Sequence, residues 1–161
     1  MPKENKIRKA ARKPLWLIMF MLKNMPMGAI AGLRVVEMDS KHAVVTVPYK
    51  HLNINPFKSM YFAVMSMAAE LSSGVQAIAL VNEAPKPVSM LVFNMQASFT
   101  KKARTRIRFV CNDGQKIAEA INESLKTGDG KTVDVTSTGY DTAGDVVAVF
   151  KFTWTFKPKK V

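Results

Sequence analysis

An apolar stripe at helical spacing runs through residues 59–78, and it constrains the fold more than any other feature. The residues that recur every three or four positions are Met60, Val64, Met67, Leu71, Val75 and Ile78. Pro56, just ahead of the stripe, suits the start of a helix. Because the apolar face persists for about five turns, the pattern predicts one continuous helix packed on a sheet.

A second, polar stripe lies about 120° around the same helix. Its members are Ser59, Ser66, Glu70 and Ser73. A carboxylate among apolar residues in the middle of a helix is usually paired or functional, because burying an unpaired charge is costly. Glu70 is therefore either a functional carboxylate or a structural one at an interface, and the sequence leaves both interpretations open.

Segments with the composition of strands surround this helix. Val-rich or partly alternating patterns occur at residues 32–38, 41–49, 87–103, 104–112, 131–141 and 145–159,. Between the fourth and fifth segments, Ile117, Ala120, Ile121 and Leu125 recur at helical spacing, with Gly128 as a stop,. The sequence thus predicts an α+β protein in which an antiparallel sheet wraps a long central helix.

The amino-terminal region differs from the rest in composition. Residues 1–27 combine a basic stretch with the apolar run 15–22, which is far shorter than the roughly 20 residues needed to cross a bilayer,. We expect a basic amphipathic helical leader that covers a single domain at residues 28–161. Two alternatives stay open for the leader, a membrane-surface anchor and a secretory signal.

Charge and cysteine content narrow the function classes. The 161 residues carry a net charge of +12, which favours an anionic partner such as a phosphate-bearing molecule, an acidic membrane surface or nucleic acid,. Nucleic acid is disfavoured, because the basic residues lack interleaved exposed aromatic side chains. The single cysteine, Cys111, fits a reducing cytoplasm, and we expect neither a metal site nor a cofactor,.

Three stretches resemble a known family. They are GLRVVEMDSKHAVVTVPYKHLNINPFKSMYFAVMSMAAELSSG, SFTKKARTRIRFVCNDGQKIAEAINE and VDVTSTGYDTAGDVVAVFKF. In order and character they resemble an uncharacterised DUF4442-type branch of the hotdog thioesterase superfamily, related to the phenylacetate-type thioesterases. The resemblance implies a hotdog fold, acyl-CoA or a related acyl thioester as the substrate, and a homodimer or a dimer of dimers.

The resemblance also suggests site residues. In phenylacetate-type relatives an asparagine precedes a His-Gly-Gly turn, and an acidic residue lies about two turns into the helix. Asn55 matches that asparagine, whereas residues 57–59 read Phe-Lys-Ser. The acidic position falls on Ser66, and Glu70 stands one turn later on the same face.

A thioesterase site needs a group that polarises the carbonyl and a base. Free N–H groups around Ser59 and Met60, in the predicted first turn, would bind the oxyanion, and Glu70 would activate water. Ser59 and Glu70 are eleven residues, or about 16 Å, apart on one helix. We therefore expect Glu70 to serve the site of a neighbouring subunit, or Ser66 to hold the water instead.

Further residues are candidates for binding the substrate. Tyr61 belongs either to the core or to an acyl pocket. Arg104, Arg106 and Arg108 would stand on one face if the strand continued through them. Such a row would suit the phosphates of coenzyme A, although a solvated strand face explains it equally well.

These observations predict an acyl-CoA thioesterase-like protein that binds an acyl thioester and hydrolyses it. Two other functions stay open. One is a non-catalytic acyl- or lipid-binding hotdog protein, and the other is a basic protein that makes peripheral membrane contact through its leader.

Overall fold

The computed structural model describes residues 14–159, so most of the predicted basic stretch, residues 1–13, lies outside the described part. The helical elements are α2 (Pro14–Asn24), α3 (Pro26–Ala31), the 3-10 turn η1 (His51–Asn53), α4 (Phe62–Glu83) and α5 (Gly114–Thr127). The strands are β1 (Arg34–Met38), β2 (Ala43–Val47), β3 (Val88–Phe99), β4 (Ile107–Cys111), β5 (Lys131–Tyr140) and β6 (Val146–Pro158).

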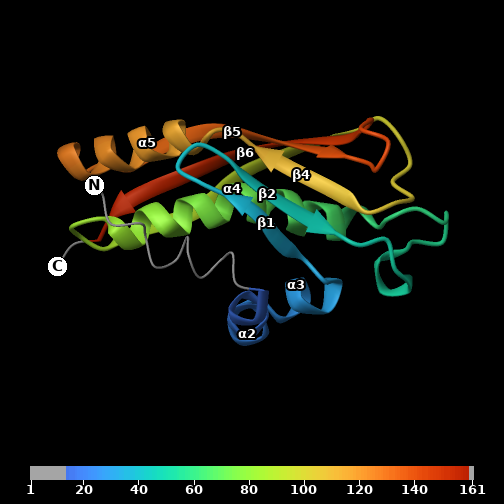
Figure 1. Cartoon of the computed structure of the whole chain (residues 1–161). Coiled ribbons are helices and arrows are strands. Elements are labelled where there is room, and N and C mark those ends of the chain that lie inside the picture. The colour runs from blue at the N-terminus through green and yellow to red at the C-terminus, as the bar shows by residue number, and fades with distance from the viewer. Residues whose placement is uncertain (1–13, 160–161) are drawn as a thin grey trace.

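The six strands form one antiparallel sheet in the order β1-β2-β4-β5-β6-β3. The sheet wraps the long helix α4, and α5 packs beside it against β5 and β6 (Figure 1). Alternate residues of β6, among them Phe150, Phe152 and Phe156, point into the core and are fully or almost fully buried. The predicted α+β architecture, a sheet around a central helix, is confirmed.

Helix α4 is continuous, as predicted, but its ends differ from the predicted ones. It begins at Phe62, not at Ser59, because Met60 donates its N–H to Ala103 O (2.7 Å) and Tyr61 donates to Asn53 O (2.8 Å). These bonds to other segments hold the two residues outside the helix. The helix extends past Ile78 to Glu83, and Ala84, which precedes Pro85, is extended, as residues before proline usually are,.

All six predicted strands are present, and so is the second helix, α5. Gly128 ends α5 in the left-handed conformation with a φ of 78°, as expected of a helix stop,. The fourth strand is shorter than predicted, because β4 begins only at Ile107. Arg104 and Arg106 therefore lie in the loop before β4, and the predicted strand row of three arginines is wrong.

The described part of the leader consists of two short helices. They separate at Met25, directly before Pro26, which is the first residue of α3,. Met21 of α2 is buried in the main core, so this segment packs against the domain. The Asn53 side chain donates to Ala31 O (2.9 Å) and Pro48 O (2.8 Å), which ties the end of α3 to the loop ahead of α4. The proposed boundary at residue 28 stays a prediction.

Candidate functional site

A tight turn at residues 55–59 leads into helix α4, and Asn55 organises it. The Asn55 side-chain oxygen accepts the N–H of Phe57 (3.0 Å), the N–H of Ser59 (3.2 Å) and the hydroxyl of Ser59 (3.2 Å). The backbone closes the same turn, since the N–H of Asn55 donates to Ser59 O (2.9 Å). Asn55, which the resemblance singled out, therefore fixes the shape of this turn.

Lys58 occupies an unusual backbone conformation in this turn. Its φ is 56°, which makes it the only described residue other than glycine with a positive φ. The left-handed region is costly for a residue with a Cβ atom, and such residues concentrate at functional sites. The Tyr49 hydroxyl donates to Lys58 O (2.9 Å) and helps to hold the conformation.

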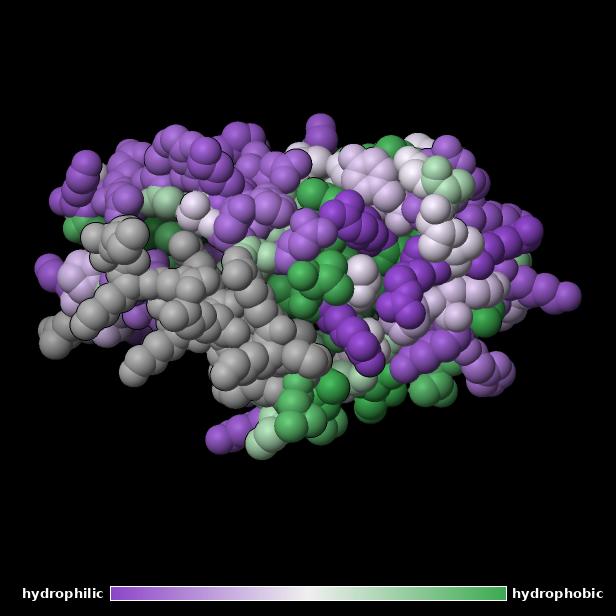
Figure 2. Space-filling model, viewed as in Figure 1, coloured by the Kyte–Doolittle hydropathy of each residue, from purple (hydrophilic) through white to green (hydrophobic). Residues whose placement is uncertain are grey.

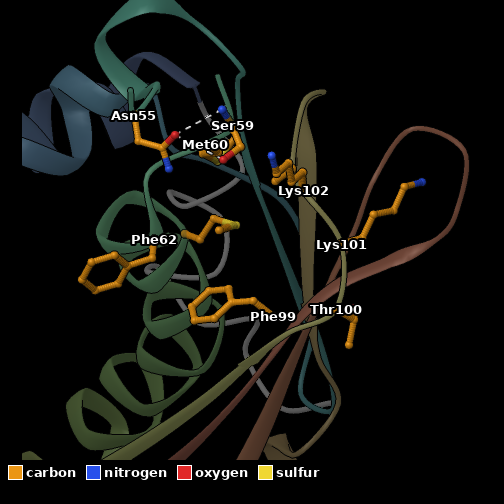
Figure 3. Close-up of a pocket in the computed structure, with 10 residues that line it drawn as sticks. Asn55, Ser59, Met60, Phe62, Phe99, Thr100, Lys101 and Lys102 are labelled. Atoms are coloured by element: carbon orange, nitrogen blue, oxygen red, sulfur yellow. Dashed lines mark hydrogen bonds between the residues drawn. The ribbon is translucent and has the colours of Figure 1, made fainter. Parts of the chain in front are cut away.

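The turn borders a pocket of about 380 Å³ between the start of α4 and the end of β3. Figure 3 shows Phe62 and Phe99 beside the helix and Asn55, Ser59 and Lys102 around the pocket. The complete lining is Asn55, Ser59, Met60, Phe62, Met65, Phe99, Thr100, Lys101, Lys102 and Ala103. The pocket thus combines apolar side chains with a polar turn and two lysines.

The backbone donors at this pocket are not the predicted ones. The N–H groups of Ser59 and Met60 are both occupied, by Asn55 and by Ala103. Because α4 begins three residues later, its first-turn donors are those of Phe62 and Ala63, for which the described chain supplies no acceptor,. The expectation of free donors at Ser59 and Met60 is therefore wrong, although both residues line the pocket.

The two lysines at the pocket differ in their pairing. Lys101 forms ion pairs with Asp141 (2.7 Å) and Asp145 (2.6 Å) of the β5–β6 hairpin. Within residues 14–159, Lys102 forms no ion pair, and neither do Arg104 and Arg106. Lys102 in the pocket lining, and Arg104 and Arg106 in the loop that follows it, are therefore available to an anion within the described chain.

Arg108, the third member of the predicted arginine row, lies apart from this group. Its guanidinium donates to a Glu37 carboxylate oxygen at 2.7 Å, and Glu37 in turn lies beside His42. Arg108 does not line the pocket. Its predicted contact with a coenzyme A phosphate at this pocket is therefore not supported by the structure.

Glu70 lies two turns further along α4 and does not line the pocket. Its side chain is partly buried and has no ion pair or side-chain hydrogen bond among the described residues. Burial alone raises the pKa of Glu70 to about 7. A Cβ atom built on Gly74 would lie 2.8 Å from its Oε1 atom, so the carboxylate leans toward the turn that follows, away from the pocket.

Ser66 and Tyr61 also lie outside the pocket lining. The Ser66 hydroxyl donates to Phe62 O (2.9 Å) within the helix, which leaves its oxygen free to accept. Tyr61 is partly exposed and makes an edge contact with Phe62, their ring centroids 4.9 Å apart. The structure therefore brings together Asn55, Ser59 and Met60, while the roles predicted for Ser66, Glu70 and Tyr61 stay predictions.

Phe62, Met65, Phe99 and residues 100–103 line the pocket, although the sequence analysis did not assign them to a site. The long-range bond from Met60 N–H to Ala103 O, which no local pattern reveals, joins the last of these segments to the start of α4. Among the described residues no group of three or more His, Cys, Asp or Glu side chains is placed to hold a metal ion. Cys111 is buried, and burial raises the pKa of its thiol to about 11.

The sequence matches one protein family over most of its length. The family model of DUF4442, described as a domain of unknown function, matches residues 14–156. The chain belongs to the DUF4442 family. The match begins at the first residue of α2, so this family includes the leader helices as well as the sheet. We found no curated protein that matches this DUF4442 chain.

Solved structures with the same fold come from several bacteria. A Pseudomonas aeruginosa protein of unknown function, described as a probable thioesterase, has a TM-score of 0.77 at 21% identity, over 91% of this chain and 97% of that chain. A Chlorobaculum tepidum protein with unknown function has a TM-score of 0.76 at 16% identity, over 93% and 99% of the two chains. A Haemophilus influenzae thioesterase has a TM-score of 0.61 at 10% identity, over 87% and 88%. This DUF4442 protein therefore has the hotdog fold of thioesterase-like proteins.

Proposed function

We propose that this protein is an acyl-CoA thioesterase that binds an acyl thioester at the start of α4 and hydrolyses it. The observation that carries the proposal is the pocket of about 380 Å³ lined by Phe62, whose N–H group, like that of Ala63, has no acceptor among the described residues. The first N–H groups of a helix point out of its amino end and carry partial positive charge. They suit the negative charge that develops on a thioester oxygen during attack by water.

The base in this proposal is Glu70 of a second copy of the chain. Within one chain Phe62 and Glu70 are eight residues, or about 12 Å, apart along the helix, and the carboxylate leans further away,. A carboxyl group with a pKa near 7 is well matched to removing a proton from water at neutral pH,. A partner subunit that faces α4 would bring its Glu70 to this pocket and receive Glu70 of this chain in return.

One of the two edges of the sheet, strand β3, supports such a dimer. Strand β3 is twelve residues long, pairs only with β6 among the described strands, and exposes Leu91, Phe93, Met95 and Phe99. An exposed apolar edge strand is a ready surface for pairing with another strand. We propose that two copies of β3 lie side by side, which places the α4 helices near each other.

Three cations that form no ion pair within the described chain would bind the phosphates of coenzyme A in this proposal. Lys102 lines the pocket, and Arg104 and Arg106 follow it in the same loop. Neutralising Lys102 and Arg104 should weaken the binding of coenzyme A, and raised salt should do the same. Arg108→Gln is the matched control, because Arg108 is already paired with Glu37.

The test is release of free thiol from a panel of acyl-CoA substrates by the purified protein. Phe62→Pro is the informative variant, because it removes one first-turn N–H where proline is well tolerated in a helix. Tyr61 already has the extended conformation (φ −66°, ψ 131°) that a following proline requires,. The matched control, Phe62→Ala, loses the same ring but keeps the N–H.

We expect Phe62→Pro to turn over about 10²-fold more slowly than Phe62→Ala while both stay folded. Equal rates in the two variants would show that the Phe62 N–H has no part in catalysis. A protein that binds acyl-CoA tightly but releases no thiol from any substrate in the panel would instead be a non-catalytic acyl-binding protein.

A further inference from the structure

Helices α2 and α3 present an apolar surface that nothing in the described chain covers. Its residues are Leu15, Met19, Leu22, Met27 and Ile30, whose side chains are between 51% and 73% exposed. Figure 2 shows hydrophobic atoms gathered over α2 and α3 at the lower edge of the molecule. We call this set the α2–α3 face.

The α2–α3 face is larger than packing on the domain requires. Residues 14–22 are all apolar. Among the α2 side chains that the structure describes, which exclude those of residues 14, 16 and 17, only Met21 is fully buried, and Phe20 is partly buried against the core. A helix that is apolar all round normally buries its whole circumference. The outward side of α2 is therefore suited to contact with an apolar partner outside the domain.

The basic residues that neighbour this face in the sequence favour one kind of partner. Residues 5–36 contain no Asp or Glu, and their basic residues are Lys6, Arg8, Lys9, Arg12, Lys13, Lys23 and Arg34. Apolar residues beside a run of cations are the composition of segments that bind anionic membrane surfaces, where the cations meet lipid headgroups. A second copy of this chain would bring the same positive charge to the contact and be repelled.

Length shows that such a contact would lie on the bilayer and not cross it. Helix α2 has eleven residues, or about 16 Å, against a hydrocarbon core of about 30 Å,. Among the described helices only α4 has the length and hydropathy to span a membrane, and 67% of its apolar window is buried inside the domain. The geometry thus fits a helix pair that lies in the lipid interface.

We propose that the α2–α3 face docks this protein on an anionic lipid bilayer. The face is coupled to the candidate site, because Lys50 donates to Ile30 O (2.7 Å) and Asn53 donates to Ala31 O (2.9 Å). Both bonds fasten the end of α3 to the loop that leads into the turn at residues 55–59. The docked protein would therefore hold its pocket near the membrane surface.

The test is sedimentation of the full chain with vesicles of phosphatidylcholine alone or mixed with phosphatidylserine. Leu22→Glu and Met27→Glu each place a negative charge on the α2–α3 face at a largely exposed position. Val146→Glu is the control, because it makes the same kind of change at a partly exposed site on the β5–β6 hairpin. Thermal melting of each variant checks that it stays folded.

We expect the wild type to sediment with the mixed vesicles, and the Leu22→Glu, Met27→Glu double variant to bind about tenfold more weakly. Val146→Glu should bind like the wild type. The proposal is overturned if the wild type does not sediment with mixed vesicles, or if the double variant binds as well as the control. It is also overturned if the double variant loses only self-association. None of these results depends on whether the protein hydrolyses a thioester.

Discussion

At the residue scale, Glu70 and Ser66 are the two candidates for holding the attacking water in the proposed thioesterase. If Glu70 is the base, Glu70→Gln keeps its shape but cannot accept a proton, and turnover should fall by about 10² to 10⁴. Ser66→Ala should then change turnover little, since the Ser66 hydroxyl already donates to Phe62 O. Steady-state rates with the best acyl-CoA substrate distinguish the two. Normal turnover in Glu70→Gln with loss in Ser66→Ala would reverse the assignment.

The same carboxyl group predicts a pH dependence of stability. Burial raises the pKa of Glu70 to about 7 in the folded chain, against an ordinary value of 4.5 that applies when the chain unfolds. Between these values the folded state retains the proton and the unfolded state has released it, so rising pH disfavours folding. Relative to Glu70→Gln, the wild type should lose about 3 kcal/mol of unfolding free energy from pH 4.5 to 7.

Urea unfolding of both proteins across that pH range measures this difference. A constant difference between wild type and Glu70→Gln would mean that the carboxyl group is not buried in solution. The pH dependence of turnover is a second test of the Glu70 pKa. A base with this pKa should make turnover rise with pH and level off above about 7.

At this scale the sequence identified Asn55 but misplaced the backbone donors. Asn55 was recognisable because it matches a family position, whereas the role of Glu70, a carboxylate on an apolar helix, stays a prediction. The free N–H groups were misplaced by three residues, because bonds from Met60 to Ala103 and from Tyr61 to Asn53 decide where α4 begins. Such contacts join distant segments and leave no local pattern.

At the element scale, two glycines at the ends of α5 should respond differently to alanine. A Cβ atom on Gly114 would lie 2.6 Å from Ser40 O and 2.9 Å from Lys41 O, and it would also meet the buried Gln76 side chain. Gly114→Ala should cost about 3 kcal/mol of unfolding free energy through this overlap. Gly128→Ala, with no neighbour within 4 Å but a φ of 78°, should cost only about 1 kcal/mol,.

Thermal or urea unfolding of the two variants measures the contrast. Equal losses would show that the space around Gly114 is not closed as the structure describes. The comparison separates the cost of close packing, at Gly114, from the cost of a left-handed backbone conformation, at Gly128.

Most elements were predictable because their patterns are strong and local. The stripe of α4, the alternation of β5 and β6 and the stop at Gly128 each reflect one helix face, one sheet face or one turn. The start of β4 was not predictable. Residues 104–106 have the composition of a strand, but they precede Ile107, the first residue of β4 that pairs with β2. Pairing with a neighbour, and not composition, ends a strand.

At the scale of the whole molecule, the separation of Phe62 and Glu70 on one helix decides how a catalytic site can be assembled. Because Glu70 leans away from the pocket of its own chain, each site should draw its N–H donors from one subunit and its base from the other. A C2 dimer built on β3 would contain two such shared sites. Whether the sites are shared can be tested by combining two variants in one dimer.

Two inactive variants should restore activity when they are combined in one dimer. In a dimer of a Phe62→Pro subunit with a Glu70→Gln subunit, one shared site carries both changes and the other carries neither. Co-expression with two different tags, followed by purification on both, yields this mixed dimer. If sites are shared, its thiol release should be about half that of the wild-type dimer. If each site lies within one subunit, both sites are damaged, and the mixed dimer should be as inactive as its parents.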